Sequence, residues 1–196
     1  EGVGISCGSA AVTGAIDAVT VENNALRCHV IGGGTARSLC GSGLLDAVAA
    51  LRRLELVEDS GYMEDDSLPL SGSVSLLRRD IRSFQLAKAA VAAGIRVLLQ
   101  QRGITPEQMD GVYLAGGFGS YLDPDSAIAI GMLPRACAGK LRTLGNTALA
   151  GAAALTLDPA QWQRIRTISR ACNYLELSGR ADFAAAFTGN LPFPQP

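Results

Sequence analysis

The stretch Gly111-Val112-Tyr113-Leu114-Ala115-Gly116-Gly117-Phe118-Gly119 decides the fold of this chain. Its first half is a short apolar run, which favours a β-strand. The strand leads directly into glycines, which have no Cβ and therefore let a ligand approach the backbone. The N–H groups that follow such a strand can meet a nucleotide ring or a phosphate. The same residues also suit a tight strand-to-helix turn with no ligand, so this motif alone leaves both interpretations open.

Strands and helices alternate on both sides of this stretch. The predicted elements are a β-hairpin over residues 15–31, a helix from residue 44, a loop over 58–72, a strand over 74–77, a long helix over 81–102, a helix from about residue 123, a strand over 141–144, and helices over 147–157, 159–172 and 181–187. Asp80 suits the N-cap of the long helix and Gly103 suits its C-terminal end. The alternation predicts an α/β layered domain.

The composition excludes several classes of protein. Hydrophobic residues make up 48% and charged residues 18% of the 196 residues, as in a globular domain. A net charge of -1 provides no basic field for nucleic acid or anionic lipid. No run reaches the roughly 18 apolar residues of a membrane span. The five cysteines are widely spaced and form no C-x-x-C, which argues against a local zinc or iron–sulfur loop and favours reduced thiols in the cytoplasm.

Two other groups of residues are candidate ligand contacts. Gly41-Ser42-Gly43 stands at a predicted helix start, but it is not a dinucleotide fingerprint, because the third glycine position is Asp46. Gln85 and Lys88 lie three residues apart and therefore on one face of the long helix. They could hold a ribose or a base edge, and a solvated helix face explains them as well. The opening Glu1-Gly2-Val3 suggests that the sequence is cut from a longer protein.

The order of the motifs resembles the C-terminal domain of the ATP-dependent reductive activators of corrinoid proteins. The resemblance is carried by Asp80–Lys88, Val112–Gly119, Gly131-Met132-Leu133-Pro134 and Gly145–Ala152. Two shorter stretches, Leu39–Asp46 and Tyr174–Ser178, fit it too. It spans nearly the whole chain, which makes it more specific than any single glycine run. Residues 6–13 and 32–39 match the family pattern poorly, which leaves room for a divergent partner.

The resemblance implies an actin-type ATPase fold, ribonuclease-H-like, with a mixed sheet flanked by helices. Residues 1–196 would form its C-terminal lobe. It makes Gly116, Gly117, Phe118 and Gly119 similar to the adenosine motif of the superfamily of actin, sugar kinases and heat-shock chaperone ATPases. The remaining predicted nucleotide contacts are Gln85, Lys88, Gly41, Ser42, Gly43 and Asn146. The helix after Gly145-Asn146 would be the hinge helix between two lobes.

The resemblance also implies cofactors and partners. ATP with Mg²⁺ would be shared with a second lobe, and an iron–sulfur cluster would lie in an N-terminal domain, with no metal in these 196 residues. The parent would use ATP to return a Co(II) corrinoid protein to Co(I), while these residues alone would be inactive. The expected partners are the corrinoid protein and the remaining domains of the parent. Nucleic acid and membrane are not expected as partners, and the resemblance is compatible with a homodimer.

Three alternatives stay open at this point. The activators of radical dehydratases belong to the same superfamily and hold a four-iron cluster between two subunits, for which Cys40 occupies a comparable position. Their second cysteine should precede the long helix, near residues 74–80, where this sequence has none. The other two alternatives are a small-molecule kinase of the same fold and a non-catalytic interaction domain.

Overall fold

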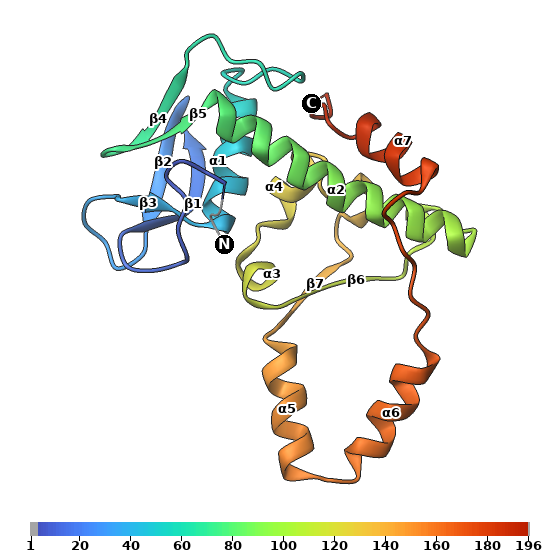
Figure 1. Ribbon diagram of the computed structural model, residues 1–196. Helices are drawn as coiled ribbons and strands as arrows, with labels where there is room; N and C mark the ends of the chain where they lie inside the picture. Colours follow the sequence, from blue (N-terminus) through green and yellow to red (C-terminus); the bar gives the residue numbers. More distant parts are fainter. Residues whose placement is uncertain (1–3, 196) are drawn as a thin grey trace.

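The computed structural model describes residues 4–195 (Figure 1). The predicted hairpin is its first regular element. Glu1-Gly2-Val3, from which an upstream segment was expected, lies outside the described residues. Strands β1 (Ala15–Glu22) and β2 (Ala25–Val30) pair antiparallel. Asn23 and Asn24 form the turn with φ angles of 50° and 60°, which asparagine tolerates better than most residues. The short strand β3 (Ser38–Leu39), which was not predicted, pairs parallel with the start of β1.

Helix α1 (Gly41–Arg53) packs directly against β1. The backbones come so close that a Cβ added to Gly43 would lie 2.2 Å from the carbonyl oxygen of Ile16. Only glycine fits at that position. The helix buries Leu45, Val48 and Leu51, whose spacing of three residues keeps them on one face.

A second pair of strands lies beside the hairpin. Strand β4 (Ser67–Ser71) pairs antiparallel with β5 (Val74–Leu77). The prediction of a loop over residues 58–72 is therefore wrong at its C-terminal end. Pro69 obscures the strand pattern there, yet it is tolerated because β4 has β5 as its only strand partner among residues 4–195. Leu68 supplies the buried contact that holds β4 in place.

The longest helix, α2 (Arg78–Arg102), crosses the molecule and carries α7 (Ala181–Gly189) along its C-terminal half (Figure 1). It begins three residues before the predicted start. Asp80 is therefore not the N-cap but a residue of the first turn, where its carboxylate accepts from the backbone N–H of Leu77 at 3.0 Å. Gly103 ends the helix with a φ of 65°, as predicted.

Strands β6 (Val112–Ala115) and β7 (Leu141–Gly145) pair parallel. A 3-10 turn over Pro106–Gln108 leads from α2 toward β6. The crossover between the two strands contains α3 (Gly117–Tyr121), α4 (Pro124–Ala129) and a 3-10 turn at Arg135–Cys137. The sequence analysis had placed a helix at α4 but only a turn at α3.

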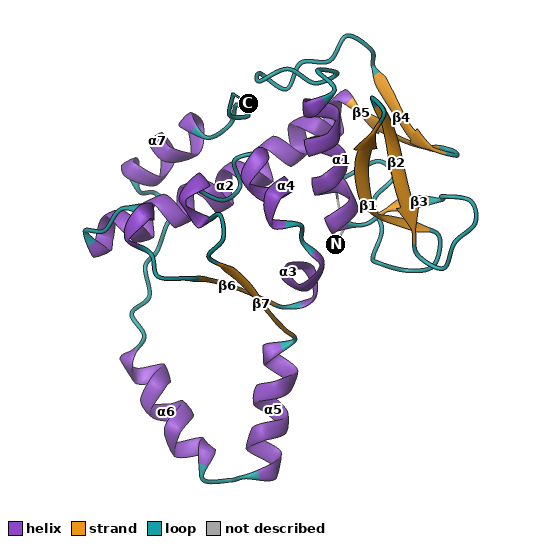
Figure 2. Ribbon diagram, turned by 180° about the vertical axis from the view of Figure 1, so that it is seen from behind, coloured by secondary structure: helices purple, strands orange, loops and turns teal. Residues whose placement is uncertain are grey.

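Helices α5 (Thr147–Leu157) and α6 (Gln161–Ala171) project from the rest of the molecule as an open hairpin (Figures 1 and 2). Neither helix has a buried residue. Leu149 and Leu157 on α5 are 65% and 85% exposed, and Trp162 on α6 is 52% exposed. The projection leaves an apolar surface uncovered.

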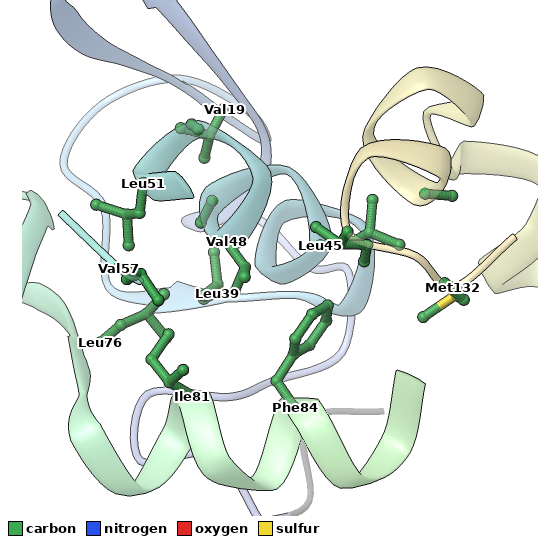
Figure 3. Packing of buried hydrophobic residues seen from close by; sticks show 14 of the residues in the cluster. Val19, Leu39, Leu45, Val48, Leu51, Val57, Leu76, Ile81, Phe84 and Met132 are labelled. Atoms are coloured by element: carbon green, nitrogen blue, oxygen red, sulfur yellow. The ribbon is translucent and has the colours of Figure 1, made fainter. Parts of the chain in front are cut away.

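The core lies where α1, α2, the hairpin and the α4 region meet. Leu45 and Val48 of α1 point toward Ile81 and Phe84 of α2, with Met132 closing one end (Figure 3). The α/β fold class is confirmed, and the strands of residues 4–195 form three small sheets in place of one. Within this described range, no helix has the length and hydrophobicity to cross a bilayer.

Candidate nucleotide site at the ends of β6 and β7

The two parallel strands bring the glycine-rich stretch and the Gly145-Asn146 turn to one edge. Ala115 is in register with Gly145, and the N–H of Gly116 donates to the carbonyl of Gly145 at 2.9 Å. In open α/β sheets, ligands bind outside the carboxyl ends of the strands, which is this edge. Residues that lie about 30 positions apart in the sequence therefore become neighbours.

The backbone at this edge is open. Gly116 has a φ of 92°, a backbone angle that residues other than glycine rarely adopt, and Gly117 is exposed. A Cβ added at either position would meet no heavy atom within 4 Å. Gly119 differs, since it is buried and a Cβ there would lie 3.3 Å from Leu114. Two of the three glycines thus leave free space, whereas the third serves packing.

Phe118 connects this edge to the start of α1. A Cβ on Gly41 would lie 3.1 Å from the Phe118 ring, which places the two predicted ligand contacts side by side. Ser42 is buried, and its hydroxyl donates to the carbonyl of Asp17 at 2.9 Å. Gly43 is required by the packing of α1 against β1. Of the Gly41-Ser42-Gly43 motif, only Gly41 borders the glycine edge, while Ser42 and Gly43 hold the helix to the sheet.

Asn146 follows β7 at the same edge. Its side-chain oxygen accepts from the N–H of Leu149 at 3.0 Å and so caps α5. The residue is exposed. The structure therefore brings together Gly41, the glycine stretch and Asn146. Their assignment as nucleotide contacts stays a prediction.

Gln85 and Lys88 are engaged elsewhere. Both side chains are buried beneath the C-terminal tail, where Gln85 donates to the carbonyls of Ser60 at 2.9 Å and of Leu191 at 3.2 Å. Lys88 donates to the carbonyl of Pro192 at 2.6 Å. A nucleotide could reach them only if the tail left, so their predicted role is untested, and their observed role is to bind the tail.

The same tail places a buried aromatic ring between two cations. Phe193 is only 3% exposed, with the Lys88 ammonium 5.0 Å and the Arg52 guanidinium 5.4 Å from its ring centroid. Burial lowers the pKa of Lys88 to about 8, and the charge of Arg52 acts in the same direction. Phe193 of the tail is thus part of the core.

One polar residue of interest, Asp46 of α1, was not among the predicted site residues. It is only 6% exposed, and one carboxyl oxygen accepts from the N–H of Val19 at 3.4 Å while the other, Oδ1, has no partner. The pKa of Asp46 is raised to about 6, mainly by burial and to a lesser extent by the Asp123 and Asp17 carboxylates, while hydrogen bonds from Ser126 and Val19 act in the opposite direction. The sequence signal was available, because an aspartate stands between the buried residues Leu45 and Ala47.

Cys40 does not lie in a metal site. Its side chain is buried, and its sulfur lies 3.3 Å from the Ser42 hydroxyl. Within residues 4–195, no three His, Cys, Asp or Glu side chains come together in a way that could hold a metal ion.

Fold and site together define a class, an α/β domain of the actin-like type with an open glycine edge at the ends of parallel strands. The family model described as the C-terminal domain of RACo, the ASKHA domain, matches residues 1–196, and the chain belongs to this family. The predicted resemblance to corrinoid activators is thereby confirmed.

Individual relatives agree with the family. The chain is 29% identical to the corrinoid activation enzyme RamQ of Eubacterium limosum, over 98% of this chain and 37% of that protein. It is 27% identical to the [Co(II) methylated amine-specific corrinoid protein] reductase of Methanosarcina barkeri, over 87% of this chain and 35% of that protein. The solved structure of a reductive activator for corrinoid,iron-sulfur protein superposes with a TM-score of 0.88 at 30% identity, covering 99% of this chain and 35% of that one. The chain thus spans little more than a third of these relatives.

Proposed function

We propose that this chain is the nucleotide-binding part of an ATP-dependent reductive activase, which returns a Co(II) corrinoid protein to Co(I). The electron would come from an iron–sulfur domain elsewhere in the parent protein. The proposal is supported by relatives that are described as a corrinoid activation enzyme, a reductase of a Co(II) corrinoid protein and a reductive activator.

The observation that carries the proposal is the open glycine edge at Gly116 and Gly117. Free space where a Cβ would stand fits a flat ring that lies against the backbone. Gly41, Phe118 and Asn146 border this edge and would contact the adenosine. ATP with Mg²⁺ would supply the free energy of binding that drives a conformational change. The magnesium ligands would come from the parent's other lobe, as the family resemblance implies.

Helix α5 supports the idea of a two-lobed clamp. It contains no charged residue, and an apolar helix of this kind is stable only when other protein covers it. Its N-cap is Asn146, which lies directly beside the glycine edge. A second lobe that covered α5 would therefore also close over the nucleotide. Binding of ATP could then favour the closed conformation and so change the complex with the corrinoid protein.

The corrinoid relatives favour this function over a radical dehydratase activator. In that alternative Cys40 would ligate a cluster shared between subunits, but here it is buried at the start of α1. A small-molecule kinase or a non-catalytic domain receives no support from a specific contact in this chain.

The test is Gly117→Val in the full-length parent protein. The position is exposed and open, so the variant should fold normally, while its side chain would occupy the space proposed for adenosine. We expect ATP affinity, measured by calorimetry, to fall at least roughly tenfold, and ATP-dependent formation of Co(I), followed by visible absorption, to be lost. Gly189→Val is the matched control, because its Cβ is also unhindered and it lies on α7. Unchanged ATP affinity in Gly117→Val would refute the site.

A further inference from the structure

A cavity of about 490 Å³ lies between β1, α1 and α4. Its walls include apolar side chains from all three elements and the tail, namely Val19, Val21, Ala49, Ala129 and Pro194. A cavity of this volume is in the range that binds small ligands, especially when a few polar groups converge on it. Neither Gly41, the glycine stretch nor Asn146 lines it, so it is separate from the candidate nucleotide site.

The polar groups on one side of the cavity are carboxylates. Asp46 lines it from α1, and Asp123 and Asp125 line it from the start of α4. Asp46 is more than nine-tenths buried, and its Oδ1 has no hydrogen-bond partner. The Ser126 hydroxyl of α4 donates to Asp123 at 2.9 Å, and it also lies close enough to Asp46 to lower the pKa of that carboxyl group against the larger effect of burial. An ionised carboxylate can only accept hydrogen bonds, so a donor is the group that would complete this wall.

Two arginines, Arg52 and Arg53, also line the cavity, and among residues 4–195 neither forms an ion pair with these three carboxylates. Arg52 pairs with Asp59 and donates to the carbonyls of Val57 and Pro194. Arg53 is exposed at the rim. The Asp17 carboxylate, which lies 2.5 Å from Nδ1 of His29, acts on Asp46 through its negative charge and raises the pKa of that group. Burying an unpaired carboxylate is costly, which makes a cationic donor the complementary ligand.

We propose that this cavity binds a primary ammonium group on an aliphatic stem, with Asp46, Asp123 and Asp125 receiving the cation and the apolar walls receiving the stem. A metal ion fits less well, because the residues that the structure describes contain no set of three ligands with suitable positions. An anion is disfavoured on the Asp46 side, where the three carboxylates would repel it. The ammonium group could belong to a small alkylamine or to a lysine side chain, and the two sources share the same recognition chemistry.

The test uses the full-length protein that contains this chain, with ¹³C-labelled methyl groups, and n-butylammonium chloride as the probe. We expect saturable chemical-shift changes confined to the methyl groups of Val19, Val21, Ala49 and Ala129, at constant ionic strength. The neutral analogue n-butanol should produce no saturable change. Lowering the pH through about 6 should weaken binding, because Asp46 becomes protonated. A peptide Gly-Lys-Gly is the second probe, and tighter binding of this peptide would identify a lysine side chain as the source.

Variants separate the carboxylates from general charge effects. Asp46→Asn should weaken n-butylammonium binding roughly tenfold or more, and Asp125→Asn, at an exposed position that carries no fold contact, should weaken it about threefold. Asp65→Asn, an exposed acidic residue outside the cavity, should leave the affinity unchanged. If both probes produce no saturable shift, if n-butanol binds equally well, or if Asp125→Asn and Asp46→Asn bind like the parent sequence, the proposal is wrong. None of these outcomes bears on the proposed ATP site at the glycine edge, which is tested separately by Gly117→Val.

Discussion

Replacing Asp46 with asparagine should change the stability of the fold in a pH-dependent way. Burial raises the pKa of this carboxyl group from 3.8 to about 6, so the folded state binds the proton more tightly than the unfolded chain does. The stability that Asp46 contributes is therefore complete below about pH 4 and is lost as the pH rises through about 6. A change from 3.8 to about 6 corresponds to about 3 kcal/mol.

Asparagine resembles the protonated carboxyl group and carries no charge to bury. We expect the unfolding free energy of Asp46→Asn to be up to about 3 kcal/mol higher than that of the unsubstituted chain at pH 7.5. At pH 4 the two values should agree within about 1 kcal/mol. The new amide N–H₂ could also donate toward the carboxylate of Asp123. Urea denaturation followed by far-ultraviolet circular dichroism measures both values.

The matched control is Asp65→Asn, which removes one negative charge at an exposed position. It should shift the unfolding free energy by no more than about 0.5 kcal/mol at either pH. Loss of stability in Asp46→Asn at both pH values would refute the reasoning. It would mean that the ionised carboxylate makes a favourable contact that outweighs its burial.

Three further predictions concern the core. The unfolding free energy of the unsubstituted chain should rise by about 2 kcal/mol between pH 7.5 and 9.5, because burial lowers the pKa of Lys88 to about 8 in the folded state while the unfolded lysine stays charged. Lys88→Met should abolish this rise, and a rise of equal size in the variant would contradict the reasoning. Phe193→Ala should lower the unfolding free energy, measured with urea, by about 3–5 kcal/mol, because the ring is buried. Pro192→Ala, at the exposed position just before it, should lower it by less than about 1 kcal/mol. Gly43→Ala should destabilise the chain by about 3 kcal/mol or prevent folding, since its Cβ would overlap a carbonyl of β1, while Gly117→Ala should change the melting temperature little; similar melting curves for the two variants would count against the packing argument.

Local sequence signals predicted most of the elements correctly. The hairpin, α5 and β7 follow from turn residues, alanine-rich helical spacing and a short apolar run, all of which act within a few residues. Errors arose where the signal is not local. Strand β4 is held by Leu68 against a distant part of the core, and its proline hides the alternation that would have revealed it.

The candidate site was predicted in part. The glycine stretch was identified from its own pattern, and the structure places Gly41 and Asn146 beside it. Gln85 and Lys88 were singled out because they share a helix face, but helical spacing does not reveal which segment covers that face. The answer lies in Leu191 and Pro192, more than 100 residues further along the chain.

The sequence by itself determined the class of fold, the family and the glycine-rich turn after β6, because strand runs, caps and turns depend on neighbouring residues. Only the tertiary structure decided which polar groups are free to act. Lys88 and Gln85 are occupied by the tail, whereas Asp46 is buried with an oxygen that has no partner. Burial and hydrogen bonding of a side chain depend on segments that pack from distant parts of the chain, and these become neighbours only when the chain has folded.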